Sequence, residues 1–430
     1  MGEGGAIDQV PLAISPSHQL LTVIYTVTVN DAIALDHPHP VAGDGFEHAG
    51  AVALIAVAGA LQFSIAIAQI LLTVALVCWV VTLLIRRERL TAPQFFWPLA
   101  AYAGATLLSA AFSSDPRTSF IDCKQLVLFL LVPAVYRLIS GPQARTLITV
   151  VLSCAAVSAA FGVIQYGILH YDQLSQRPQG TLGHYMTYSG LLMTVIAVAV
   201  ARLLFDWKDR TWAALVLPAL AVAVALTSTR SAWVGVCAAA ALLCALKDFR
   251  LFAVLPIVAA VFFALAPGMI TKRFVSMFDN KDPTRIDRVA MVHEGERMIA
   301  AHPLTGVGPN MVQKRYADYR GDDAVNKINP HLHNNPLQIA AERGLPALAL
   351  WLWFVVALCR DLQRRFASGS QRFLSAAALA AVVALLTAGL FEYNFGDSEV
   401  LMLFLIITTL PAAADAARSS VASRQSSVAG

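Results

Sequence analysis

The chain has 430 residues, of which 57% are hydrophobic and 13% are charged, and its mean hydropathy is +0.64. Soluble domains carry about 25% charged residues, so this composition excludes an ordinary soluble protein and predicts a membrane protein. The formal charge of +4 is scattered over loops and the six cysteines lack Cys-x-x-Cys spacing, so neither nucleic acid, a zinc site nor a disulfide framework is expected.

The first 85 residues contain no Lys or Arg, so we expect no secretory signal peptide there. An apolar piece at residues 20–29 is short, and it is followed by Asp31, Asp36 and several prolines. We therefore expect residues 1–47 to form an N-terminal non-spanning segment, with a poorly formed extra span as the alternative.

Twelve apolar runs follow, and runs of about 17–25 residues suit helices that cross a bilayer. They lie at residues 48–62, 64–85, 94–113, 120–139, 146–169, 182–204, 211–227, 229–246, 250–268, 336–359, 373–393 and 397–413. The break between the first two is weak. The sequence therefore predicts an all-α polytopic membrane protein with about 12 transmembrane helices, nine within residues 48–268 and three within residues 336–413.

Basic residues predict the orientation of these helices. They follow the even-numbered helices, at Arg86, Arg87, Arg89, Arg137, Arg145, Arg202, Lys208, Arg210, Lys247, Arg250, Arg360, Arg364, Arg365, Arg372, Arg418 and Arg424. The positive-inside rule assigns such loops to the cytoplasm. Both termini, including a tail at residues 414–430, are then cytoplasmic. The long loop at residues 269–335 lies on the opposite side, and its spacing predicts a short helix at residues 285–301.

Four polar groups fall on this opposite side, at residues 177–188, 227–233, 285–310 and 331–344. Ionisable groups at a membrane boundary are costly, so they are functional candidates by default. In the last group, Asn335 followed by Pro336 fits a helix N-cap with proline at the first helical position. One face of that helix carries polar side chains at four-residue spacing, which are Asn334, Gln338 and Glu342.

The remaining members of these groups suit acid–base chemistry and anion binding. His333 precedes the helix at the membrane surface, where imidazole, which titrates near neutral pH, suits proton transfer. Arg177 and Arg230 stand at the outer ends of two other helices, and guanidinium is a bidentate partner for phosphate oxygens. Two such arginines could neutralise a lipid diphosphate without a metal.

Each of these residues also has a structural interpretation. Arg177 alone fits a headgroup anchor, and Arg230 with Trp233 fits an interfacial pair. His184 fits a hydrogen-bonding role within its turn. His331 and His333 suggest a metal site only weakly, because no third ligand stands at fixed spacing.

Taken together, the motifs resemble those of the O-antigen ligase and polymerase superfamily. They are Arg-x-x-Gly-Thr at 177–181, Thr-Arg-Ser-x-Trp at 229–233, His-Pro-Leu-Thr-Gly-Val-Gly at 302–308 and His-Asn-x-x-Leu-Gln-x-x-x-Glu-x-Gly at 333–344. The order of the motifs and the long loop between the ninth and tenth helices match as well. His184 departs from the pattern, since many relatives carry an amide there.

The resemblance implies a metal-independent glycosyltransferase of the bacterial inner membrane that needs no cofactor. It would transfer a glycan from an undecaprenyl-diphosphate donor to a lipid A-core or glycan acceptor on the periplasmic side. By position, His333 would activate the acceptor hydroxyl, and Arg177 and Arg230 would hold the leaving diphosphate. Glu342 would orient this cluster, a role inferred from its helix face. The expected substrate-binding residues are Arg285, Arg288, His184, Tyr188, His331, Asn334, Gln338 and Glu342.

Other activities remain open at this stage. The loop before the sixth helix has only about fourteen residues, which favours a ligase over a polymerase with two large outer loops. A relative that glycosylates Ser or Thr of proteins is a third alternative. A lipid-linked glycan transporter is less favoured, because transporters place charges near the bilayer midplane and often contain inverted repeats.

Overall fold

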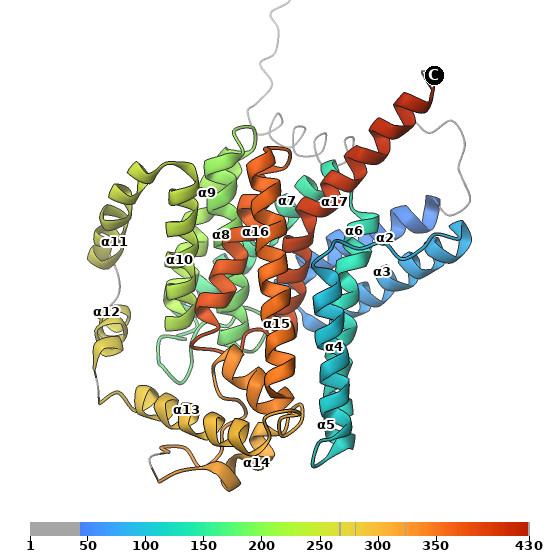
Figure 1. Ribbon diagram of the computed structural model, residues 1–430. Coiled ribbons are helices and arrows are strands. Elements are labelled where there is room, and N and C mark those ends of the chain that lie inside the picture. Colours follow the sequence, from blue (N-terminus) through green and yellow to red (C-terminus); the bar gives the residue numbers. More distant parts are fainter. Residues whose placement is uncertain (1–43, 266–267, 280, 323, 429–430) are drawn as a thin grey trace, which may run out of the picture.

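The computed structural model describes residues 44–265, 268–279, 281–322 and 324–428. Within these ranges the chain forms helices and turns, together with one isolated β-bridge between Gln173 and Gln176 (Figure 1). The predicted all-α class is therefore confirmed for the described residues. The predicted N-terminal segment falls outside them, apart from residues 44–47 in the first turn of α2.

A helix or helix group lies at each predicted apolar run. The elements are α2 (Asp44–Ala60), α3 (Ile65–Arg86), α4 (Phe96–Ala111), α5 (Pro116–Asp122), η1 (Cys123–Leu130), α6 (Leu131–Leu138), α7 (Gly141–Gly167), α8 (Tyr185–Phe205), α9 (Arg210–Leu226), α10 (Arg230–Lys247), η2 (Phe249–Ala253), α11 (Val254–Leu265), α12 (Gly268–Val275), η3 (Ser276–Phe278), α13 (Pro283–Ala301), α14 (Val312–Tyr319), α15 (Asn335–Ser368), α16 (Arg372–Ala388) and α17 (Ser398–Val428).

Seven helical stretches in the described part of the chain are long and apolar enough to cross a membrane. They are Ile65–Arg86, Pro116–Leu138, Gly141–Gly167, Tyr185–Phe205, Arg230–Lys247, Asn335–Ser368 and Ser398–Arg418. Four more apolar helices have 10–17 residues, which is short for a full span. The number of twelve crossings therefore stays a prediction.

Two helix boundaries differ from the sequence-based prediction. The Asn334 side chain caps α15 by accepting a hydrogen bond from the Leu337 amide at 2.9 Å, so the cap predicted at Asn335 is wrong by one residue. Asn335 instead donates its amide to the Gly389 carbonyl at 2.7 Å. The last helix was expected to end at residue 413, but α17 continues to Val428 and includes most of the predicted tail.

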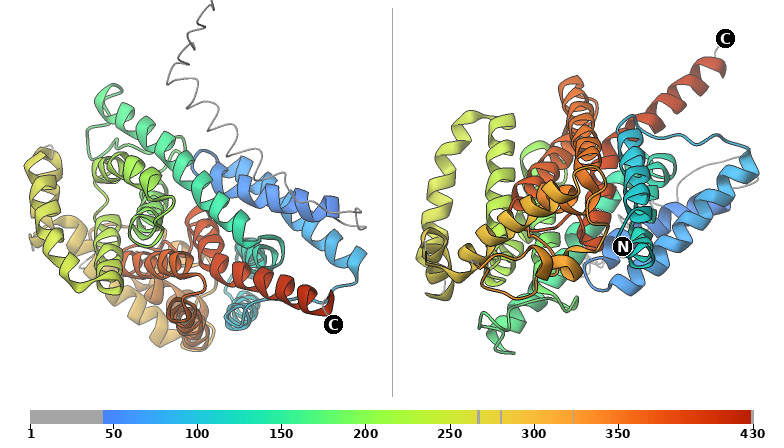
Figure 2. Two further views of the ribbon diagram at one scale, coloured as in Figure 1. Left: turned by 90° about the horizontal axis from the view of Figure 1, so that it is seen from above. Right: turned by 60° about the horizontal axis from the view of Figure 1, so that its bottom comes forward.

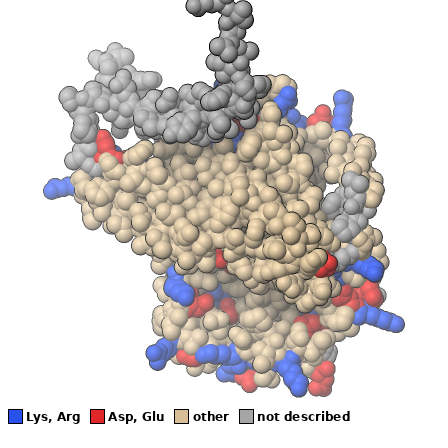
Figure 3. All heavy atoms as spheres, turned by 180° about the vertical axis from the view of Figure 1, so that it is seen from behind, with Lys and Arg blue, Asp and Glu red and all other residues tan. Residues whose placement is uncertain are grey.

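The helices pack around α16, which contacts α8, α10, α15 and α17. Its middle is rich in buried alanine, including Ala376, Ala377 and Ala378, and small side chains let helix backbones approach closely in a membrane. In contrast, α11 lies at the edge of the molecule in the views of Figures 1 and 2. On the face shown in Figure 3, charged side chains gather toward the two ends and leave a largely uncharged band between them. This pattern suits a protein whose middle faces lipid.

A break in α15 positions the long loop against the helix. Gly344 has φ +81° and ψ +168°, so it interrupts the helix, and Pro346 has no amide hydrogen to bond the freed carbonyls. The loop supplies the missing donors, because the Val307 amide donates to the Ala341 carbonyl and the Gly308 amide donates to the Glu342 carbonyl, both at 2.9 Å. A Cβ on Gly306 would lie 2.2 Å from Glu342 C, so only glycine fits this contact. The motif at residues 302–308 therefore joins the long loop to α15 through backbone hydrogen bonds.

Candidate functional site

The segment that carries His333 is fixed by hydrogen bonds on both sides. The Leu332 amide donates to the Gln338 Oε1 at 2.6 Å, and the Asn334 side chain donates to the Leu390 carbonyl at 3.0 Å. Between them, His333 adopts φ +49°, a left-handed conformation that is costly for a residue with a side chain. The surrounding bonds therefore hold the imidazole in place against backbone strain.

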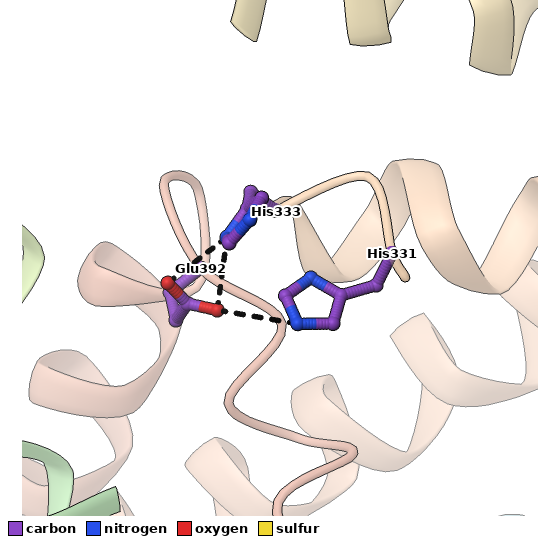
Figure 4. Close-up of side chains that lie close together, drawn as sticks. All are labelled: His331, His333 and Glu392. Carbon is purple, nitrogen blue, oxygen red and sulfur yellow. Dashed lines mark hydrogen bonds and ion pairs between the residues drawn. The ribbon is translucent and has the colours of Figure 1, made fainter. Parts of the chain in front are cut away.

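Glu392, from the connection between α16 and α17, is the direct partner of His333. Both Glu392 carboxylate oxygens lie 3.0 Å from His333 Nδ1, as Figure 4 shows. Burial by itself would raise the pKa of Glu392, but the hydrogen bond from His333 and the positive charges nearby hold it below its usual value. The ionised carboxylate accepts the proton on Nδ1, which leaves Nε2 of a neutral His333 as the proton acceptor.

His331 completes this cluster from the side. Its ring centroid lies 4.2 Å from that of His333, and its Nε2 lies 4.0 Å from Glu392 Oε1. Burial is the main cause that lowers the pKa of His331 to about 4, and the neighbouring His333 adds to the effect. The ring is therefore neutral at physiological pH.

These same three side chains could hold a metal ion, since their ligand atoms all lie within 4.8 Å of one another. The structure thus adds Glu392 as a third possible ligand, whereas the sequence shows no third ligand at a fixed spacing from His331 and His333. A tetrahedral zinc ion with ligands at about 2.1 Å needs ligand atoms roughly 3.4 Å apart, so the cluster would have to contract. The positive charge of Arg288 acts on both Glu392 and His331, which disfavours a cation there.

A cavity of about 410 Å³ lies in front of His333. Three arginines line it, namely Arg230 at the start of α10 and Arg285 and Arg288 on α13. The rest of the lining is mostly apolar, comprising Val234, Met277, Val289, Val292, Leu332, Leu390 and Phe391, with Ser231, Thr284 and Asn334 as the other polar members. Among these described lining residues none is Asp or Glu. The cavity therefore suits an amphiphilic anion.

The arginines around this cavity form one positively charged cluster. Burial lowers the pKa of Arg288, and the charge of Arg230 lowers it further. A fourth side chain, Arg273 of α12, feels the charges of both Arg230 and Arg177. Since guanidinium stays protonated in proteins, the cluster keeps its charge and favours an anionic ligand.

Arg177 lies at the margin of this cluster. Its guanidinium carbon lies 3.6 Å from the centroid of the Tyr185 ring, and its Nε donates to the Leu174 carbonyl at 2.9 Å. Arg177 is not among the residues that line the cavity.

Five other expected site residues are also not among those that line the cavity, namely His184, Tyr188, His331, Gln338 and Glu342. Tyr188 is 1% exposed and donates its hydroxyl to the Ser158 carbonyl at 2.8 Å, so it joins α8 to α7. His184 contacts the Thr187 hydroxyl at 3.3 Å. Glu342 pairs with Arg343 at 2.8 Å rather than with His333, and the position beside the imidazole belongs to Glu392.

Sequence reasoning missed Glu392 and Arg273 as members of the site. A signal for both was present, because the predicted topology put residues 392–399 and the long loop on the same side as His333. Neither residue stands at a motif spacing, however. Only the packing of the α16–α17 connection and of α12 brings them to the other residues.

Comparison with known families gives a match over part of the chain. Residues 213–352 match the family described as O-antigen ligase. This match, which covers about a third of the chain, supports membership of the O-antigen ligase superfamily. The match includes Arg230, Arg288 and His333, while Arg177 and Glu392 lie outside it. The match also supports an enzyme of the glycosyltransferase-like ligase and polymerase class. No curated protein matches the chain.

Proposed function

We propose that this protein is an O-antigen ligase that transfers a glycan from undecaprenyl diphosphate to a sugar hydroxyl of a lipid A-core acceptor. The observation that carries the proposal is the cavity in which Arg230, Arg285 and Arg288 face the same space as His333. A base next to an anion-binding cluster is what glycosyl transfer from a diphosphate requires. The site would open to the periplasmic side of the bacterial inner membrane.

In the proposed reaction, His333 Nε2 accepts the proton of the acceptor hydroxyl, while the hydroxyl oxygen attacks the anomeric carbon of the donor glycan. The bond between that carbon and the diphosphate oxygen breaks, and the diphosphate leaves with the bonding electrons. Glu392 stabilises the imidazolium that forms and keeps the ring in the required tautomer. Because no carboxylate lines the described cavity, a one-step displacement is favoured over a covalent glycosyl-enzyme.

The arginines would stabilise the charge that develops on the leaving group. Arg230 and Arg288 approach the cavity from different helices, so together they can contact both phosphates of a diphosphate. The apolar lining, including Val289 and Val292, would accommodate the first carbons of the polyprenyl chain or of the acceptor lipid. The glycan-phosphate bond is already activated, so this scheme needs no cofactor.

Replacing His333 tests the proposal most directly. His333→Ala is expected to lower the rate of transfer by about 10²–10⁴-fold, the usual contribution of a general base. The measurement is transfer of labelled glycan from its lipid diphosphate by the purified enzyme in lipid nanodiscs. His48→Ala, at an exposed position of α2, is the matched control and should keep full activity. Full activity of His333→Ala would contradict the proposal.

The products in cells separate the ligase from its nearest alternative. Loss of the whole core-linked polymer in a strain that carries His333→Ala supports a ligase. Decoration of the core with single repeat units instead indicates a polymerase. Glycan that crosses the membrane attached to its lipid diphosphate, with no covalent transfer, would indicate a transporter.

A further inference from the structure

An acidic residue of the long loop, Asp282, holds the arginine that faces the cavity. Nη2 of Arg230 donates to Asp282 Oδ2 at 2.5 Å and also to the Ser276 hydroxyl. The pair is buried, with 14% of the Arg230 side chain and 8% of Asp282 exposed. Burial alone would raise the pKa of Asp282, but hydrogen bonds from Arg230 and Thr284 lower it to about 2. The carboxylate is therefore charged at any physiological pH.

The positive charges around Asp282 outnumber the negative ones. Asp282 is the carboxylate that acts on Arg230, Arg273 and Arg288 together. Among the described residues, Arg273 and Arg288 form no hydrogen bond or ion pair of their own through the side chain. Half-buried cations without direct partners are costly, which indicates room for a further anion.

The Asp282 carboxylate uses the same donor that a phosphate would use. Carboxylate and phosphate oxygens both accept charge-assisted hydrogen bonds from guanidinium, with similar geometry. Nη2 of Arg230 cannot bind a donor phosphate fully while Asp282 and Ser276 accept its hydrogens.

We infer that Asp282 is an internal competitor that occupies the phosphate-binding side of Arg230 until the lipid diphosphate displaces it. This inference rests on the proposed function, and it identifies the ion pair between Arg230 and Asp282 as the contact that the donor diphosphate must replace. Asp282 also caps α13, since its Oδ1 accepts the Thr284 amide at 2.9 Å. Release of Arg230 therefore frees the start of α13, the helix that carries Arg285 and Arg288, from α10.

The substitution Asp282→Asn separates the two roles of this side chain. Asparagine retains an oxygen that caps α13 but loses the charge that competes with phosphate. We expect the variant to bind undecaprenyl diphosphate about ten-fold more tightly than the unchanged enzyme, because one charge-assisted bond no longer has to be exchanged. The measurement is a titration of the full-length enzyme in nanodiscs with undecaprenyl diphosphate.

Two variants serve as controls for this titration. Asp279→Asn removes the same charge from the same segment at an exposed position that does not contact Arg230, and it should leave the affinity unchanged. Asp282→Glu keeps the charge and should not bind more tightly. If Asp282→Asn does not fold, Asp282→Ser retains a capping oxygen and replaces it in the test.

The possible outcomes distinguish the inference from the proposed function. Unchanged or weaker binding by Asp282→Asn overturns the inference, because it would make Asp282 a residue that orients Arg230 for the donor. Arg230→Ala is measured in parallel and should bind undecaprenyl diphosphate at least ten-fold more weakly. If Arg230→Ala binds normally, the donor site itself is wrong, whatever Asp282→Asn does.

Discussion

Buried and half-buried arginines occur at both polar ends of the molecule, but their surroundings differ. At the end opposite the cavity, Arg137 pairs with Glu47 and Glu88, Arg202 pairs with Asp209, and Arg365 pairs with Asp361 and Asp415. At the cavity end, Arg230 pairs with Asp282, whereas Arg177, Arg273 and Arg288 form no ion pair with the described residues.

The difference shows how one residue type serves two purposes. A paired arginine at a helix end joins helices and satisfies its own charge, so it stabilises the fold. An unpaired cluster is held together only by the surrounding structure and has its charge available for a ligand. Buried cations without partners reduce stability, and binding sites are where such a cost is accepted.

Within this comparison, the largest effect is expected from removing one arginine at each end. Arg288→Ala should lower the rate of glycan transfer by about 10²–10³-fold, since it removes a charge that stabilises the leaving diphosphate, while the unfolding temperature stays the same or rises. Arg137→Ala should lower the unfolding temperature and leave the rate of glycan transfer nearly unchanged, because it leaves Glu47 and Glu88 without their partner. Transfer assays and thermal unfolding of both variants in the same detergent check this. Similar effects of both variants on both measurements would break the comparison.

A smaller effect is expected at Glu392, the partner of the proposed base. Glu392→Gln should lower kcat by about 10–100-fold with little change in KM, because it removes the carboxylate that orients His333 and stabilises its charged form. Steady-state kinetics with the lipid-linked donor provide the measurement. Glu296→Gln, an exposed position on α13, is the matched control. A change confined to KM would show that Glu392 acts on substrate binding instead.

The smallest effect is a pH dependence of stability at the cavity end. His331 has a pKa of about 4 in the folded protein against 6.5 for an exposed histidine, so between these values the unfolded chain binds the additional proton. Stability should therefore fall as the pH decreases from 6.5 to 4, by about 3 kcal/mol in all. His331→Gln should reduce this slope when unfolding is measured across that range. An unchanged slope would mean that His331 is not protected from protonation.

Much of the local structure follows from the sequence. Apolar runs located the helices because a bilayer requires about twenty apolar residues with all backbone groups bonded internally. The signals failed where tertiary contacts act. The helix cap moved from Asn335 to Asn334 because Asn335 is bonded to Gly389 of α16. The fourth predicted helix became α5, η1 and α6, which together form one helical stretch from Pro116 to Leu138.

The sequence by itself indicated the family, determined the all-helical class and supplied the candidates His333, Arg230 and Arg288, because these depend on local spacing, hydropathy and charge. Only the tertiary structure decided which carboxylate serves which group. Glu342 stands on the helix that follows His333, yet it pairs with Arg343, while Glu392 arrives from 59 residues away. Asp282 reaches Arg230 across 52 residues. Ion pairs form wherever packing brings opposite charges together, and the partners of such long-range pairs have no characteristic spacing in the sequence.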